Sequence, residues 1–172
     1  TDCADDNDVV YPGAPEICGD GVINDCDSTV TDAVDACGLG GEVSLADSRA
    51  ILVGEDRYDE AGFAVSQAGD FNGDGFGDVI VGSPYHDESS EDDGRAYIIF
   101  GDSSGEVDLS TADATFTGPS GNDFAGYSVA GGGDIDGDGI GDLIIGAYQE
   151  DSGGTNAGAA YVVLGGASGS LS

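Results

Sequence analysis

The chain has 172 residues, enough for one ordinary domain or two small ones, and it carries 35 acidic residues against three basic ones, all arginine. The formal net charge of −32 argues against nucleic acid and anionic membrane surfaces as partners, because both repel a polyanion. No apolar run approaches the ~18–20 residues that a membrane-spanning helix needs, so we expect no membrane insertion.

The first 37 residues hold all four cysteines, at positions 3, 18, 26 and 37. An even number of cysteines in a short, Asp-rich segment predicts two disulfides and an oxidising compartment, with three pairings open. A zinc site is the alternative, although it usually shows close CxxC pairs, which this segment lacks. We therefore predict a disulfide-linked, loop-rich module at 1–37 and a linker at 38–48. Whether the module binds an ion stays open; its candidate ligands are Asp6, Asp8, Asp20, Asn24, Asp25 and Asp27.

Two nine-residue stretches, 70–78 and 134–142, share one pattern. Oxygen-bearing side chains stand at positions 1, 3, 5 and 9, and glycines, which permit the positive-φ turns of a tightly curled loop, stand at positions 4, 6 and 8. A hard cation such as Ca²⁺ takes six to eight oxygen ligands, and position 7 would add a backbone carbonyl. The predicted calcium ligands are Asp70, Asn72, Asp74, the Phe76 carbonyl and Asp78 in the first loop, and Asp134, Asp136, Asp138, the Ile140 carbonyl and Asp142 in the second.

The spacing differs from that of an EF-hand, which closes its shell with a bidentate Glu at position 12. Here position 12 is Val81 or Ile145, inside an apolar run. The alternative to a calcium site is an Asp/Gly-rich turn without an ion, in which three or four crowded carboxylates would repel one another. Because the first loop has Asn72 in place of one carboxylate, we expect the second loop to bind calcium at least as tightly.

The shift that carries position 70 onto position 134 also aligns the remainder of the chain with itself without a gap, and we call this shift the repeat offset. It predicts a repeat architecture over 49–172. Short β-branched and aromatic runs between glycine turns indicate strands rather than helices. The predicted strands are 62–68, 79–81, 96–100 and 114–117 in the first repeat, and 126–130, 143–145 and 160–164 in the second. Four short antiparallel strands per repeat are typical of a β-propeller blade, so we predict an all-β fold.

Two repeats leave a propeller incomplete, since closed propellers have four to eight blades. Residues 49–54 align with 113–118 and are predicted to be the fourth strand of a preceding blade, whereas the second blade lacks its fourth strand. Three resolutions stay open. The chain is a fragment of a longer propeller, 49–54 folds back within the chain, or a homo-oligomer forms in which 49–54 of one copy completes the next. Six blades from three chains or eight from four would fit the last case.

The stretch 62–84 resembles the FG-GAP repeat of integrin alpha-subunit propellers, because Gly-Phe-Ala-Val-Ser precedes the acidic loop and Val-Ile-Val-Gly-Ser-Pro ends it. The family's Phe-Gly falls on Ala61-Gly62 and Ala125-Gly126, with Ala in place of Phe, and its Gly-Ala-Pro falls on 82–84 and 146–148. The resemblance covers about 43–172 and implies blades whose first two strands are joined by a structural calcium loop. Residues 2–27 resemble a Cys/Asp metal-binding motif of myxobacterial surface proteins, with Ser28 where a Gly usually follows.

Together these resemblances imply a calcium-binding adhesion or protein-interaction module, extracellular or on the cell surface and secreted by a bacterium. Calcium would stabilise the blades, and the protein or surface ligand stays unidentified. The alternatives are a structural surface-layer unit and the accessory domain of a secreted hydrolase or phospholipase. We expect no enzymatic activity in this chain, since it has no Gly-x-Ser-x-Gly nucleophile elbow with a usable triad and no Walker loop.

A few further residues could carry other chemistry. His86, the only histidine, stands beside acids and could act as a general base, but we expect it to be a solvated loop residue. Arg57 and Arg95 could bind anions, and we expect them to pair with nearby carboxylates instead. Tyr97 and Tyr161 are expected to be strand residues in the core.

Overall fold

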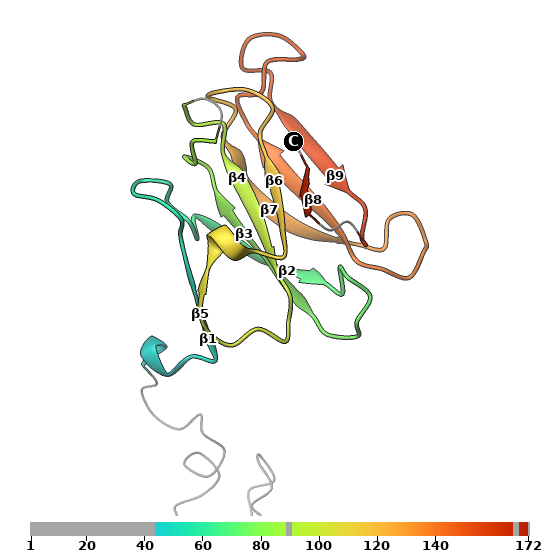
Figure 1. Ribbon diagram of the computed structural model, residues 1–172. Helices are drawn as coiled ribbons and strands as arrows, with labels where there is room; N and C mark the ends of the chain where they lie inside the picture. The colour runs from blue at the N-terminus through green and yellow to red at the C-terminus, as the bar shows by residue number, and fades with distance from the viewer. Residues whose placement is uncertain (1–43, 89–90, 167–168, 172) are drawn as a thin grey trace, which may run out of the picture. The chain divides into compact units, whose positions relative to one another are not determined.

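The computed structural model describes residues 44–88, 91–166 and 169–171 (Figure 1). The chain divides into two compact units, Thr1–Ser48 and Arg49–Ser172. The cysteine module and the Cys/Asp motif predicted in the first unit lie outside the described residues. In that unit the structure describes a short 3₁₀ helix, η1 (Leu45–Asp47), whose first turn is capped by the Ser44 side chain accepting the Ala46 N–H at 3.2 Å.

The first repeat forms an antiparallel blade in the strand order β6-β4-β3-β2, as predicted from its apolar runs. Its strands are β2 (Ala64–Gly69), β3 (Asp78–Ser83), β4 (Arg95–Ile99) and β6 (Ala114–Thr117). Every residue of β4 is buried, which agrees with a central strand covered on both faces. The predicted four-strand pattern of this blade is therefore confirmed.

The second repeat forms a three-stranded antiparallel sheet in the order β7-β8-β9. Its strands are β7 (Ala125–Gly133), β8 (Asp142–Ala147) and β9 (Ala159–Val163). Figure 1 shows this sheet, in orange to red, beside the green-to-yellow strands of the first blade. The all-β prediction is confirmed, and no helix in the described part of the chain is long and apolar enough to cross a membrane.

Two parallel strand pairs were not predicted. Strand β1 (Ala50–Val53) pairs with β5 (Gly105–Asp108), and β10 (Gly169–Leu171) pairs with β6. The pairs are equivalent, because the repeat offset carries the start of β1 onto the start of β6 and the start of β5 onto the start of β10. After its third strand, each repeat therefore sends a short segment back to the last strand of the preceding blade. In the first repeat a 3₁₀ helix, η2 (Leu109–Thr111), follows that segment.

Apolar side chains on the two faces of the first blade belong to separate clusters. One face, which includes Ile80 and Ile98, packs against Leu143 of the second sheet. The opposite face, which includes Tyr97, packs against Leu109 of η2 and against the β1 side of the blade. The expectation that Tyr97 lies in the core is confirmed, whereas its counterpart Tyr161 is only half-buried.

A polar cluster is buried beside this core, and it corrects the prediction for His86. The residue is 4% exposed, with Nδ1 2.8 Å from Asp59 Oδ2 and Nε2 3.5 Å from Glu88 Oε2. The expectation of a solvated loop residue was wrong because the turn after β3 folds back, and the Gly94 N–H donates to the His86 carbonyl at 3.0 Å. Burial also raises the pKa of Tyr97, so its hydroxyl, 3.5 Å from His86 Nδ1, stays protonated.

Arg95 completes the cluster and confirms the predicted pairing with carboxylates. It lies 2.9 Å from Glu55 and also contacts Glu88, and its Nε donates to Thr117 Oγ1 at 3.1 Å. Arg57 instead places its guanidinium 5.2 Å from the ring centroid of Tyr58.

The second repeat fills the equivalent positions differently. The repeat offset carries Asp59 onto Asp123 and His86 onto Glu150, so two acids replace a His–Asp pair. Both acids are buried. Burial raises the pKa of Asp123 and the charge of Glu150 raises it further, although the Ser120 N–H, 3.0 Å from Oδ2, favours the carboxylate. The folded protein therefore holds a proton on Asp123 more tightly than the unfolded chain does.

We expect Asp123→Asn to raise the melting temperature at pH 7 by about 2–4 °C. The amide keeps an acceptor for Ser120 and removes a buried charge next to Glu150. Because the folded-state pKa is raised, the wild-type carboxyl contributes most to stability below its unfolded pKa and loses that contribution as the pH rises through the folded value. The advantage of the variant should therefore shrink toward about pH 3, which thermal unfolding across this range in calcium would test.

The matched control is the equivalent change in the first repeat, Asp59→Asn. It should lower the melting temperature at pH 7, since it removes the charge that faces His86 Nδ1 at 2.8 Å. A fall in both variants would contradict the assignment of Asp123 as a destabilising charge.

Candidate metal centre

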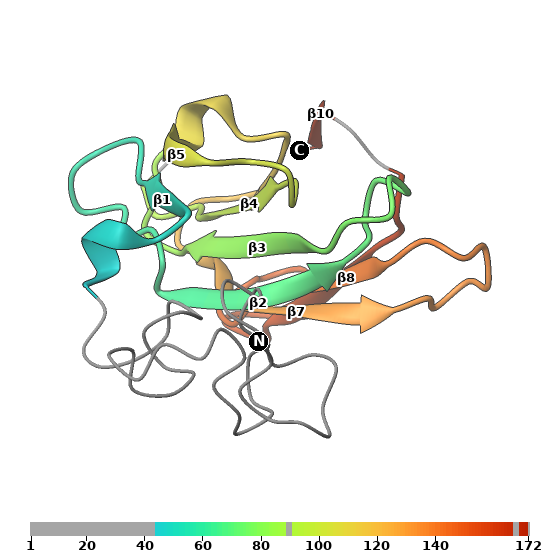
Figure 2. The ribbon, with the colours of Figure 1, turned by 90° about the horizontal axis from the view of Figure 1, so that it is seen from below.

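The two acidic loops occupy equivalent turns, one between β2 and β3 and the other between β7 and β8. Figure 2 shows these turns at the same end of the two sheets. They contact each other through the backbone, where the Gly141 N–H donates to the Asp70 carbonyl at 2.8 Å. Each loop therefore helps to position the other.

In the second loop, the side chains at positions 1, 3 and 5 converge. One oxygen from each of Asp134, Asp136 and Asp138 lies within 4.8 Å of the other two. Asp134 shapes the loop by accepting N–H groups from Gly137 and Asp138 on Oδ1, at 2.7 and 3.0 Å, and from Gly139 on Oδ2 at 2.9 Å. Both of these glycines have positive φ, 83° and 90°, which explains the residue type at positions 4 and 6.

The first loop has the same internal bonds. Asp70 Oδ1 accepts N–H groups from Gly73 at 2.8 Å and Asp74 at 2.9 Å. Asn72 Oδ1 accepts the same Asp74 N–H at 2.9 Å, and its amide donates to Asp74 Oδ2 at 2.8 Å. The structure thus brings together the predicted ligands at positions 1, 3 and 5 in this loop too, with an amide–carboxylate bond replacing one carboxylate–carboxylate repulsion.

Position 9 is oriented toward the sheet. Asp78 and Asp142 are buried, and each accepts on Oδ2 the N–H of position 2, at 2.9 Å from Phe71 and 2.5 Å from Ile135. Their Oδ1 atoms accept an N–H from the chain just after the third strand of the blade, at 3.0 and 2.7 Å. Burial raises the pKa of Asp78, and its backbone hydrogen bonds oppose that shift. Position 9 therefore ties each loop to the third strand of its own blade.

Position 7 has a mixed placement. The N–H groups of Phe76 and Ile140 each donate to the carboxylate at position 5, at 2.8 Å in both loops. The Phe76 side chain is exposed, so its role in the loop is carried by the backbone. The donor atoms that the loops gather are all oxygens, which fits a hard cation such as Ca²⁺ better than a thiophilic metal.

An aromatic cluster that the sequence analysis did not predict lies at the opposite ends of the same strands. Ring centroids lie 4.8 Å apart for Phe63 and Tyr127, 4.5 Å for Tyr127 and Tyr148, 5.3 Å for Tyr148 and Phe124, and 5.5 Å for Phe124 and Tyr85. Phe63, Tyr127 and Tyr148 are exposed. The signal for this cluster was the aromatic residue directly after Gly62 and again after Gly126. We refer to these five rings as the aromatic patch.

The comparisons with known proteins agree with this geometry. The family model of the FG-GAP repeat matches residues 61–99 and 125–163, which contain the two acidic loops. The chain is 37% identical over 100 residues to integrin alpha pat-2 of Caenorhabditis elegans, covering 57% of this chain and 8% of that protein. It is 36% identical over 106 residues to integrin alpha-5 of Xenopus laevis, covering 59% of this chain and 10% of that protein.

The match to integrin alpha-IIb of Homo sapiens is similar, with 36% identity over 100 residues, 57% of this chain and 9% of that protein. The chain therefore spans about a tenth or less of the length of these relatives. Within that span, the repeat boundaries, the acidic loops and the blade strands coincide. The chain is an FG-GAP repeat protein, and its two sheets are integrin-like propeller blades.

Proposed function

We propose that the chain is a calcium-binding adhesion or protein-interaction module that works outside the cell or on its surface. The observation that carries this proposal is the convergence of the position 1, 3 and 5 side chains in loops that belong to FG-GAP repeats. Such loops at equivalent turns of two blades are suited to hold ions that stabilise a binding scaffold rather than ions that do chemistry.

The ligands that would hold Ca²⁺ are those predicted from the sequence. Positions 1, 3 and 5 are already gathered, position 9 carries a buried carboxylate, and position 7 offers a backbone carbonyl. The cation would supply positive charge between carboxylates that otherwise repel. Because Asp78 and Asp142 also bond the chain after the third strand, a cation held by the loop would stabilise the sheet as well as the turn.

The aromatic patch is the surface we assign to partner binding. Exposed, clustered aromatic residues are uncommon on a surface without a partner, and aromatic residues dominate the energetics of protein interfaces. The patch draws on residues next to both β2 and β7, so a partner would contact both blades at once. It lies away from the acidic loops, which leaves the loops free for a stabilising role.

Two alternatives give different measurements. The accessory domain of a hydrolase would occur beside an activity, yet His86 is buried against Asp59 and is not available as a general base. A structural surface-layer unit would bind calcium but no separate ligand. An ester-hydrolysis panel and a ligand array therefore separate the three functions.

We expect two calcium ions to bind per chain and calcium removal to lower the melting temperature. A site that binds only the folded state adds about 2.7 kcal/mol at a 100-fold excess over Kd. Asp138→Asn should weaken the second site at least tenfold and lower the melting temperature in calcium, because the variant loses one carboxylate charge from the three that converge. Isothermal titration calorimetry and thermal unfolding with and without EDTA give both quantities.

The control for this change is Asp102→Asn, which removes the same charge from an exposed residue outside the loops. Its calcium affinity should match that of the wild type. Identical melting temperatures with and without EDTA in the wild-type protein would overturn the calcium proposal.

We expect the calcium-loaded chain to bind at least one component of an array of extracellular matrix proteins and bacterial surface polysaccharides. The double variant Tyr127→Ser, Tyr148→Ser should weaken that binding at least tenfold, since it removes two exposed rings from the aromatic patch. Surface plasmon resonance against the captured component measures the loss. Unchanged binding by the double variant would show that the partner surface lies elsewhere, and turnover in the ester panel would favour the hydrolase.

A further inference from the structure

The outer face of the second blade exposes residues whose counterparts in the first blade are buried. Ile80 and Ile98 are 0% exposed, whereas their counterparts at the repeat offset, Ile144 and Val162, are 36% and 55% exposed. In the first blade this face is covered by the second sheet. The second blade therefore has an apolar face of the type that normally receives another blade.

The outer face of the first blade shows the complementary feature. Val79 is 39% exposed, while Leu143, its counterpart in the second blade, is fully buried against the first blade. Val65 is exposed, while its counterpart Val129 packs into the same buried cluster. The two faces left open at the ends of the pair are therefore equivalent to the two faces that meet between the blades.

The backbone shows the same relation. Between the blades, Gly82 and Gly126 approach so closely that a Cβ on Gly82 would lie 2.0 Å from the Gly126 carbonyl oxygen. Gly62 is the counterpart of Gly126, with φ of 90° against 83°. A Cβ on Gly62 would have no other atom within 4 Å. Gly62 has the backbone of a blade contact without a neighbouring blade.

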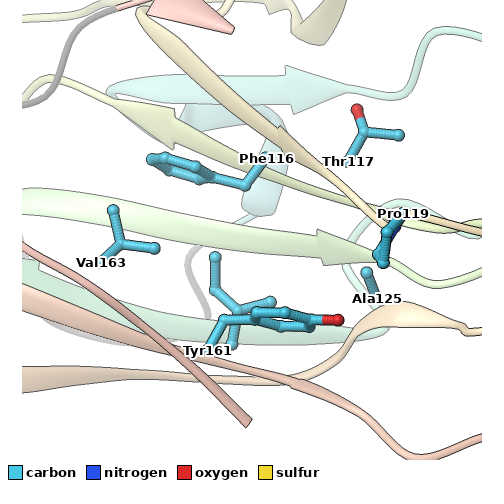
Figure 3. A pocket seen from close by; sticks show the side chains of 7 residues that line it. Phe116, Thr117, Pro119, Ala125, Tyr161 and Val163 are labelled. Atoms are coloured by element: carbon cyan, nitrogen blue, oxygen red, sulfur yellow. The ribbon is translucent and has the colours of Figure 1, made fainter. Parts of the chain in front are cut away.

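A cavity of about 280 Å³ lies between the blades (Figure 3). Its lining residues in the described part of the chain are Phe116, Thr117, Pro119, Ala125, Ile145, Tyr161 and Val163. Figure 3 shows Phe116 on one side of the hollow and Tyr161 and Val163 on the other. In the first repeat, five of these residues have as counterparts Leu52, Ala61, Val81, Tyr97 and Ile99. In the first blade this second set packs around Leu109 of η2, which is 0% exposed.

The chain carries one side chain that matches this cavity. Leu45 is the counterpart of Leu109, lies in the 3₁₀ helix η1 and is 88% exposed. Both helices begin with the same cap, in which the side chain of Ser44 or Asp108 accepts the N–H two residues later. A leucine presented by such a helix is the group that fills the equivalent space in the first blade.

We propose that copies of this chain associate head to tail, with Leu45 of one copy filling the interblade cavity of the next. Strand β1 of the first copy then pairs antiparallel with β9 of the second, whose outer edge has no strand partner among the described residues. The register follows from β4 and β6, where Arg95 pairs with Thr117 and Ile98 pairs with Ala114. It places Val53 opposite Ala159 and Ala50 opposite Val162.

The occupant is a second copy because one chain carries both halves of the contact. The exposed leucine, β1 and the open face of the first blade form one half, and the cavity, β9 and the open face of the second blade form the other. Contacts between unlike surfaces build rings when the rotation closes. Three or four copies would give six or eight blades, within the range of closed propellers.

Sedimentation velocity of the full chain in calcium tests this proposal. We expect a trimer or tetramer, and we expect Leu45→Asp and Val162→Asp each to shift the mass to that of a monomer. Both side chains are exposed, so neither change should unfold the chain, which circular dichroism verifies. Leu45→Met and Ser104→Asp, the latter an added charge at an exposed position outside the contact, should retain the assembly.

Mixing the two disrupted variants distinguishes head-to-tail contact from a symmetric dimer. Val162→Asp keeps an intact Leu45 and β1, and Leu45→Asp keeps an intact cavity and β9, so one good contact should form and give a 1:1 heterodimer. A wild-type protein that stays a folded monomer at high concentration, or a mixture that stays monomeric, would overturn the proposal. So would a Leu45→Asp variant that still assembles.

Discussion

Each blade is a thin sheet with two apolar faces, and both faces must be covered. Ile80 and Ile98 on one side of the first blade and Tyr97 on the other are all fully buried, although they alternate along neighbouring strands. One face is covered by a whole sheet, and the other by η2 and the β1 side of the blade. This requirement explains why a chain of two repeats also builds parallel strand pairs that extend beyond either blade.

The same requirement explains where glycine and charge occur. Gly82 and Gly126 allow two backbones to meet where a side chain would clash, so the blades pack closely enough to exclude water. Acidic residues are then left to the turns and edges, which produces a net charge of −32 on a small chain. Two Ca²⁺ ions would add only four positive charges, so solvation and salt screening of the surface must balance most of that charge.

Much of the fold could be predicted from the sequence, because the seven blade strands are runs of β-branched and aromatic residues between glycine turns. Strand β5 could not, since Gly105–Asp108 is short, polar in three of four positions and held by pairing with a distant strand. The acidic loops were predictable from spacing alone. The burial of His86 was not, because it depends on Asp59, which lies 27 positions earlier in the chain.

The differences between the two repeats show which features the fold requires. Positions 1, 5 and 9 of the loop and the glycines are identical in both repeats, and all of them shape the backbone through hydrogen bonds or positive φ. Position 3 varies between Asn72 and Asp136, and the buried pair varies between His86–Asp59 and Glu150–Asp123. These variable groups change the local charge without changing the path of the chain. The backbone pattern therefore specifies the blade, while calcium affinity and pH dependence can differ from one repeat to the next.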